Sequence, residues 1–254
     1  MRRIPPTARG AVTAVAAAAV AAAALGGPAL GATPAPTASL PAATIVKESE
    51  AALTAARTFT LSGTIREASA TLTVEVASAD GGAEARGVLD SSSASAGFLG
   101  RFAYITIRKT SYIRAGAPFW RQAVGTGAGL TAAQAAKAAT ALANRWIAFG
   151  ASYGNFGVGT LTDPRSLANG IFANVGSVRK GRPTTVRGVH AIPIVSTKGG
   201  TLYVALDGPP LPIELSGTSG GASGHVVFGY PKTVRVNAPT GARTLVQAIA
   251  LAIG

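Results

Sequence analysis

The sequence contains no cysteine, one methionine and only ten acidic residues among 254. Without a thiol the chain has no disulfide, no cysteine nucleophile and no cysteine-ligated metal. It also lacks a lipobox cysteine, so we do not expect a diacylglyceryl lipoprotein. Hydrophobic residues make up 48% of the chain and charged residues 13%, which is ample apolar material for a folded core. That core alone must hold the fold together.

Signals for catalysis are also scarce. The two histidines, His190 and His225, have no His, Asp or Glu partner at metal-ligand spacing. A G-x-S-x-G pattern occurs at 217–221, but a nucleophile elbow needs a helix after it, and a strand is expected here. The "GTGAG" turn at 125–129 lacks the buried strand and the acidic residue of a dinucleotide site. We therefore predict no enzyme, no cofactor and no metal site.

The N-terminus has the layout of a secretory signal peptide over residues 1–32. Arg2, Arg3 and Arg9 precede an apolar, alanine-rich run from Ala11 to Leu25, and small residues follow. The run is shorter than the roughly 20 residues of a membrane span, although an uncleaved anchor remains the alternative. Residues 33–43 are predicted to be a Pro/Ala spacer. We expect a secreted or extracytoplasmic cell-envelope protein.

Positive charge is in excess. The formal net charge is +13, and +10 remains without the three N-terminal arginines. Arg179, Lys180, Arg182 and Arg187 cluster around a Gly-Arg-Pro turn and are our headgroup-binding candidates. Acidic partners within reach of an exported protein are anionic membrane lipids and wall polymers rather than nucleic acid. A solvated surface without a partner is the alternative, and we expect a monomer.

Three helices are expected, together with a short helix or a tail at 241–254. They cover residues 44–57, 131–146 and 163–175. Thr44 is the expected N-cap of the first helix, and Thr131 with Gln134 forms a capping box for the second. Asp163 followed by Pro164 opens the third.

Alternation of apolar and polar residues predicts strands in the rest of the chain. They cover residues 58–66, 70–78, 84–90, 101–116, 118–123, 177–180, 184–196, 200–206, 212–217, 224–230 and 232–239. The order of helix, strands, two helices and strands predicts an α+β fold, in which a curved antiparallel sheet, a half-barrel, wraps on a few helices. Residues 44–240 are expected to form one domain.

The hairpin at 198–217 raises the question of function. Leu202, Val204 and Leu206 share one face of its first strand, and Ile213 and Leu215 can oppose them across an Asp-Gly-Pro-Pro turn. Such a face can line a ligand cavity or fill an ordinary dry core. Periodicity alone does not separate these two alternatives.

Five segments resemble the LppX/LprG-type envelope lipoproteins of actinobacteria and, more distantly, the LolA/LolB-like lipoprotein carriers. They are "AARTFTLSGTI", "SYIRAGAPFW", "NRWIAF", "LTDPRSLANGIF" and "KGGTLYVALDGPPLPIELSG". The resemblance covers roughly residues 44–240. It implies a LolA-like half-barrel that encloses acyl chains of envelope lipids or glycolipids, in a carrier or chaperone without catalytic residues. Many relatives carry a lipobox cysteine, and its absence here favours a secreted carrier or a protein held by its uncleaved signal.

The resulting hypothesis is a lipid-binding envelope protein. Its cavity candidates are Leu61, Leu72, Val74, Ile105, Ile107, Trp120, Trp146, Phe149, Leu202, Val204, Leu206, Ile213, Leu215, Val226 and Phe228. The alternative is an interaction or sensor module without a cavity, which binds wall polymers through its positive charge. Salt discriminates between them, because polymer binding falls steeply with ionic strength and burial of an acyl chain does not.

Overall fold

Thirteen strands form one sheet in the computed structural model, which describes residues 36–67, 69–93, 99–125, 131–150, 158–219 and 222–253. The strands are β1 (Phe59–Glu67), β2 (Ala70–Ala79), β3 (Glu84–Ser91), β4 (Gly100–Ile107), β5 (Thr110–Ala115), β6 (Ile147–Phe149), β7 (Val178–Lys180), β8 (Thr184–Val186), β9 (Val189–Ser196), β10 (Gly200–Ala205), β11 (Pro212–Ser219), β12 (Ala222–Gly229) and β13 (Arg243–Thr244). Their order is β13-β6-β5-β4-β3-β2-β1-β12-β11-β10-β9-β7, with β8 paired to β9. The β13–β6 pair is parallel, and the other pairs are antiparallel.

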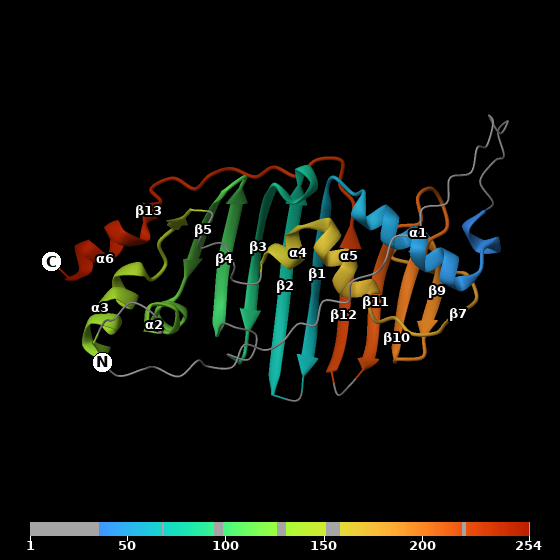
Figure 1. Cartoon of the computed structure of the whole chain (residues 1–254), viewed down its shortest axis with the longest axis horizontal. Helices are drawn as coiled ribbons and strands as arrows, with labels where there is room; N and C mark the ends of the chain where they lie inside the picture. The colour runs from blue at the N-terminus through green and yellow to red at the C-terminus, as the bar shows by residue number, and fades with distance from the viewer. Residues whose placement is uncertain are drawn as a thin grey trace, which may run out of the picture. The chain divides into compact units, whose positions relative to one another are not determined.

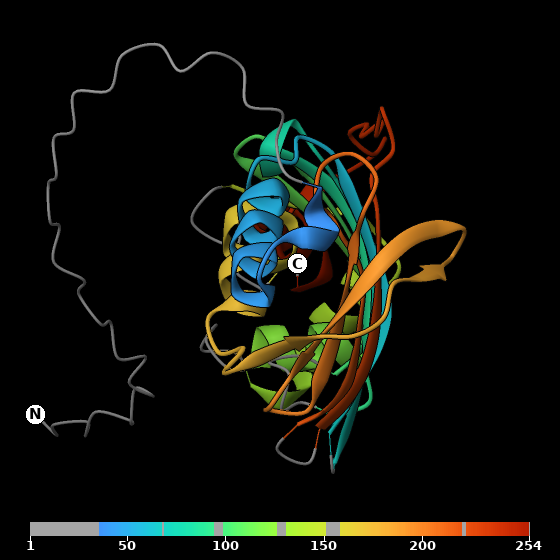
Figure 2. The same ribbon diagram turned by 90° about the vertical axis from the view of Figure 1, so that its right-hand side faces the viewer.

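The helices lie on one face of this curved sheet (Figures 1 and 2). They are α1 (Ala42–Thr54), α2 (Ala117–Gly125), α3 (Ala132–Leu142), α4 (Gly159–Thr162), α5 (Pro164–Phe172) and α6 (Leu245–Ile253), together with 3₁₀ turns at Thr37–Ser39 and Asp80–Gly82. The first group, α1, α4 and α5, covers the half of the sheet around β1 and β9–β12, while α2, α3 and α6 cover the β4–β6 end (Figure 1). The predicted α+β class with a curved antiparallel sheet is confirmed.

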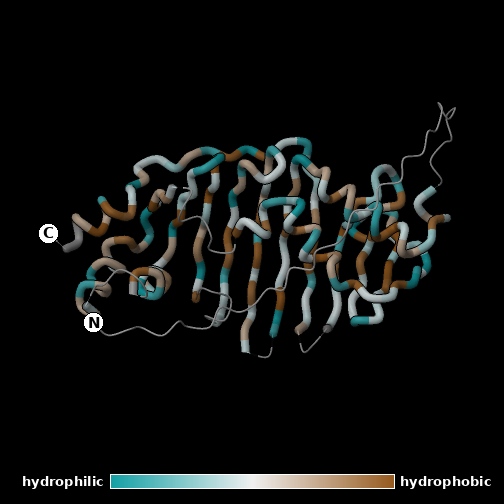
Figure 3. Tube along the Cα trace, viewed as in Figure 1, coloured by the Kyte–Doolittle hydropathy of each residue, from teal (hydrophilic) through white to brown (hydrophobic). Residues whose placement is uncertain are grey.

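Period-two sequence patterns explain the two faces of the sheet. Hydrophobic and hydrophilic stretches alternate along the strands (Figure 3). On the helical side, Leu61 of β1 stands beside Val76 of β2 in the register, and both are buried. Exposed Ser62 stands beside exposed Glu75 on the other face. An antiparallel sheet with one apolar face must cover that face, and the helices do so.

Two predicted helix starts are confirmed by their hydrogen bonds. The Thr131 hydroxyl accepts from the Gln134 amide at 3.3 Å, and the Gln134 side chain accepts from the Thr131 amide at 2.9 Å, which completes the capping box of α3. The Asp163 carboxylate accepts from the Ser166 amide at 2.6 Å, and Pro164 occupies the first position of α5. Each cap satisfies a backbone donor that the helix leaves free.

The expected start of the first helix and the expected strand at 118–123 are wrong. Helix α1 starts at Ala42, after Pro41, so Thr44 lies inside it. Residues 118–123 belong to α2, where Pro118 sits in the first turn, a position that tolerates proline. Helix formation buries both Phe119 and Trp120, whereas successive residues of a strand point to opposite faces.

The expected strand at 232–239 is also absent from the structure, although Val234 and Val236 are half-buried. The preceding strand, β12, already has β1 and β11 as its two neighbours, so no free edge remains beside it. The segment is held instead by single contacts, such as the Arg86 side chain donating to the Arg235 carbonyl at 3.2 Å.

The C-terminal residues form α6, the helix that was one of the two expected alternatives. It packs against α3 and β6, and its Ala248 is buried in the common core. Within the described ranges no helix is both long and apolar enough to cross a membrane. The expected signal peptide, 1–32, lies outside the described residues.

Candidate functional site

An apolar pocket with a volume of about 280 Å³ lies between the sheet and the helices α1 and α5. Helix α1 contributes Val46, and α5 contributes Ile171 and Phe172. The sheet contributes residues of β1 and β9–β12. The apolar side chains from the strands are Ile65, Ile194, Leu202, Leu215, Ala222 and Val226. The pocket is therefore built from elements more than 150 positions apart in the chain.

Glycines create this space. In the register of the sheet, Gly200 stands beside Gly217, Gly217 beside Gly224, and Gly224 beside Ile65. All four residues line the pocket. Two residues away on each of these strands, the next row on the same face consists of Leu202, Leu215 and Val226, whose side chains occupy the corresponding positions. Three neighbouring strands thus lack side chains at one level of the face that the helices cover.

Backbone geometry makes glycine necessary at one of these positions. Gly217 has φ +154°, and a Cβ there would lie 2.4 Å from the Gly199 carbonyl oxygen. At Gly200 a Cβ would lie 3.7 Å from its nearest neighbour, the Ser216 oxygen, which is ordinary contact. At Gly224 the nearest atom, in Ile65, would lie 3.6 Å away. Gly200 and Gly224 therefore keep the pocket open without a backbone requirement for glycine.

Polar groups of the β9–β10 turn and of the segment after α5 line one end of the pocket. The Ser196 hydroxyl donates to the Val175 carbonyl and accepts from the Lys198 amide at 2.9 Å. The Thr197 amide donates to the Ser177 carbonyl at 2.9 Å. Asn174, Lys198 and Gly199 line the pocket and are exposed, so this end opens to solvent.

Lys198 is the charged residue of the pocket lining. A Cβ at Gly176 would lie 3.2 Å from Lys198 Cγ and 3.5 Å from its Cε, so the aliphatic part of the lysine passes over this glycine. Gly176 itself has φ +68°, a left-handed conformation that glycine adopts at little cost. Among the described residues no carboxylate pairs with Lys198.

Three cavity candidates from the sequence, Leu202, Leu215 and Val226, line this pocket. The structure buries others in the core outside it: Leu61, Val74, Val204, Ile213 and Phe228. Leu72 and Leu206 are half-buried against that core. Val204 lies two residues beyond Leu202 on the same face of β10 and is fully buried.

The expected inward orientation of Ile105 and Ile107 is wrong. Ile105 stands beside Arg86 and Tyr112 in the register, on the face without helices, and Ile107 is two residues further along the same strand. Phe102 and Tyr104 take the inward positions of β4 and are buried. Both faces of this strand carry apolar residues, so the alternation in the sequence did not determine which face packs against the core.

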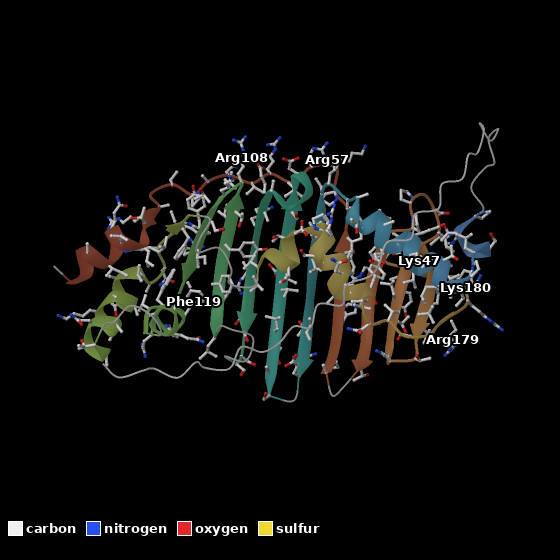
Figure 4. All side chains as sticks on the ribbon, in the orientation of Figure 1. Lys47, Arg57, Arg108, Phe119, Arg179 and Lys180 are labelled. Carbon is white, nitrogen blue, oxygen red and sulfur yellow. The ribbon has the colours of Figure 1, made fainter. Side chains whose placement is uncertain are left out.

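Trp120 and Phe149 lie at the far end of the sheet from the pocket, in an aromatic cluster with Phe102 and Phe119 (Figure 4 labels Phe119). The ring centroids of Trp120 and Phe149 are 6.1 Å apart, and the two rings are nearly parallel. Trp146 is half-exposed and receives the Arg114 guanidinium 5.1 Å above its ring. Burial raises the pKa of neighbouring Tyr104, so its phenol stays neutral.

None of the four headgroup candidates lines the pocket. Figure 4 shows Arg179 and Lys180 at the β7 end of the sheet. The Lys180 ammonium donates to the Ala38 and Leu40 carbonyls at 2.9 and 2.8 Å, which ties it to the start of α1. Arg187 pairs with Glu214 at 3.2 Å, and Arg182 is exposed.

Sequence reasoning missed the pocket's glycines and Lys198. A signal for the glycines exists, because they continue the apolar alternation in "GTLYV", "IELSG" and "GHVVF". In each segment the glycine shares the face of the inward residues. Lys198 carried no such signal, since a lysine in a turn is usually a solvated charge.

In the described part of the chain, His, Asp and Glu side chains do not gather into a metal-binding cluster. No cluster of three or more His, Cys, Asp or Glu residues with metal-binding geometry occurs there. The G-x-S-x-G pattern lies on the β11–β12 hairpin, with Gly220 and Gly221 outside the described residues, and strand β12 follows it rather than a helix. His225 Nε2 lies 3.1 Å from Glu214 Oε1, in a contact that joins β11 to β12.

Comparison with known proteins supports the fold. No protein-family model matches the sequence, and no curated protein matches it. Among solved structures, LprF from Mycobacterium bovis is similar with a TM-score of 0.53 and 11% identity, over 79% of this chain and 97% of LprF. The Mycobacterium tuberculosis lipoprotein LppX has a TM-score of 0.47 and 11% identity, over 77% of this chain and 98% of its own. The chain therefore has an LprF-like fold.

Proposed function

We propose that this protein binds lipid non-enzymatically and holds an acyl chain in the pocket between α1, α5 and β9–β12. The glycine row of Gly200, Gly217 and Gly224 carries the proposal, because glycine weakens a strand and the backbone does not require it at Gly200 or Gly224. The fold similarity and the resemblance of the sequence to envelope lipid carriers support it.

The proposed mechanism is passive. Each methylene that moves from water into the pocket contributes about 0.8 kcal/mol, and no covalent step is required. The basic, alanine-rich N-terminus supports export, which would place the pocket in the cell envelope, where acyl chains are abundant. A carrier or chaperone for envelope lipids or glycolipids is the role that fits this combination.

A pair of adjacent substitutions tests the pocket. Gly200 and Thr201 are consecutive in β10 and lie on opposite faces, and only Gly200 lines the pocket. Gly200→Phe should fill the pocket and lower lipid loading at least tenfold, without a backbone clash. Thr201→Phe adds a comparable ring to the other face and should leave loading unchanged.

The measurement is native mass spectrometry of the full chain, purified without detergent from its own host, followed by organic extraction. The proposal expects a co-purifying acylated mass in the unmodified protein and in Thr201→Phe, and its loss in Gly200→Phe. Circular dichroism confirms that both variants fold. An unmodified protein that carries no lipid, and stays free of it after incubation with host lipids, contradicts the proposal.

A further inference from the structure

The pocket's size limits its occupant. An apolar cavity of about 150 Å³ holds benzene, with six carbons. By proportion, a cavity of 280 Å³ holds roughly eleven chain carbons. Pockets for larger ligands run from about 300 to 1,000 Å³. The space under α1 and α5 therefore suits one chain, and not the two or three chains of a multiply acylated lipid.

The pocket's charge also limits its occupant. Lys198 is the charged residue of the lining, and the polar groups around it are neutral: Asn174, Ser196, Ser216 and Ser223. Ser196 fixes the Lys198 backbone, and Gly176 supports the lysine stem. No carboxylate among the described residues neutralises the ammonium. A head group that leaves this end of the pocket therefore meets an uncompensated positive charge.

We infer that the preferred occupant is a single-chain amphiphile with an anionic head, a carboxylate or a phosphate, whose chain fills the pocket to about eleven carbons while Lys198 pairs with the head. This inference rests on the proposed function, since it assumes that the pocket takes an acyl chain. It goes beyond the proposed function because it specifies a single acyl chain, a limit on the length of that chain and Lys198 as the residue that selects the anionic head group. Lys198 thus takes the role that the sequence had suggested for the 179–187 cluster.

A chain-length series tests the size limit. Isothermal titration of the full chain with saturated carboxylates of eight to sixteen carbons, each below its micelle concentration, gives the affinities. Each buried methylene should raise the affinity about fourfold. The rise should stop at ten to twelve carbons. An affinity that climbs steadily to sixteen carbons overturns the length limit.

A set of head groups on one ten-carbon chain tests the role of Lys198. Decanoate or decyl phosphate should bind about fivefold tighter than decanol, the effect expected of a single solvent-exposed ion pair. Lys198→Met should remove this preference, and Lys198→Glu should reverse it in favour of decylamine. Lys109→Glu, in the exposed β4–β5 turn, makes the same change in net charge and should leave the preference intact.

The outcomes separate the two proposals. If decanol binds, Gly200→Phe blocks it and Lys198→Glu changes nothing, the pocket is a lipid site and the inference about the head group fails. If no ten-carbon ligand binds, or Gly200→Phe binds them as the unmodified protein does, the proposed function itself fails. Lys198 is exposed, so its variants should fold, and a thermal melt verifies this.

Discussion

Ser49 is a polar residue in the middle of the buried face of α1. It lies one turn from both Ile45 and Leu53, and all three side chains have 0% exposure. Its hydroxyl has no hydrogen-bond partner among the described residues. A buried hydroxyl without a partner costs free energy, because it gives up its hydrogen bonds to water.

Replacing this hydroxyl should therefore stabilise the protein. Ser49→Ala is expected to raise the free energy of unfolding by about 1 kcal/mol, measured by urea denaturation. Exposed Glu48, the preceding residue in the helix, provides the control, since Glu48→Ala should change stability by less than about 0.5 kcal/mol. A loss of stability in Ser49→Ala would mean that the hydroxyl has a partner after all.

At the scale of elements, α5 depends on its first turn. Asp163 caps it through the 2.6 Å bond to the Ser166 amide, and the helix delivers Ile171 and Phe172 to the pocket wall. The cap satisfies an amide that would otherwise lack a partner. The stability of this short helix is thus linked to the shape of the pocket.

Asp163→Ala should lower the free energy of unfolding by about 1 kcal/mol and weaken lipid loading, because the wall at Phe172 loosens. Urea denaturation and the native mass measurement give the two values. Exposed Arg165, in the same turn, is the matched control, and Arg165→Ala should leave both values nearly unchanged. Full stability in Asp163→Ala would contradict the importance assigned to the cap.

Elements whose structure depends on nearby residues in the sequence were predicted, and those whose structure depends on packing against distant segments were not. The Thr131–Gln134 box and the Asp163–Pro164 start are short-range chemistry, and both were found. The strand at 232–239 has a local pattern as good as that of β2, yet it finds no free edge beside β12. Helix α2 was not predicted, because four of its residues, "PFWR", are equally compatible with a strand.

At the scale of the whole molecule, ligand binding and folding are linked, because the pocket walls come from both ends of the domain sequence. Val46 of α1 and Val226 of β12 meet there only in the folded chain. A ligand that binds the folded state alone, at one hundred times its dissociation constant, stabilises that state by about 2.7 kcal/mol.

Saturating decanoate should therefore raise the melting temperature by roughly 5–10 °C, at about 2–4 °C per kcal/mol for a domain of this size. Differential scanning calorimetry measures the shift. Gly200→Phe, whose pocket is filled, should melt at the same temperature with and without the ligand. An equal shift in this variant would show that decanoate binds elsewhere on the protein.

The sequence by itself determined the fold class, most element types and the absence of cysteine chemistry, because these depend on composition and on periodicity along one segment. It also placed Leu202, Leu215 and Val226 on the correct faces of their strands. Only the tertiary structure decided where space remains. Leu202 and Val204 follow the same alternation, yet one lines the pocket and the other is fully enclosed. The difference arises from strand register, which aligns Gly200, Gly217 and Gly224, and from the helices that cover the sheet around them.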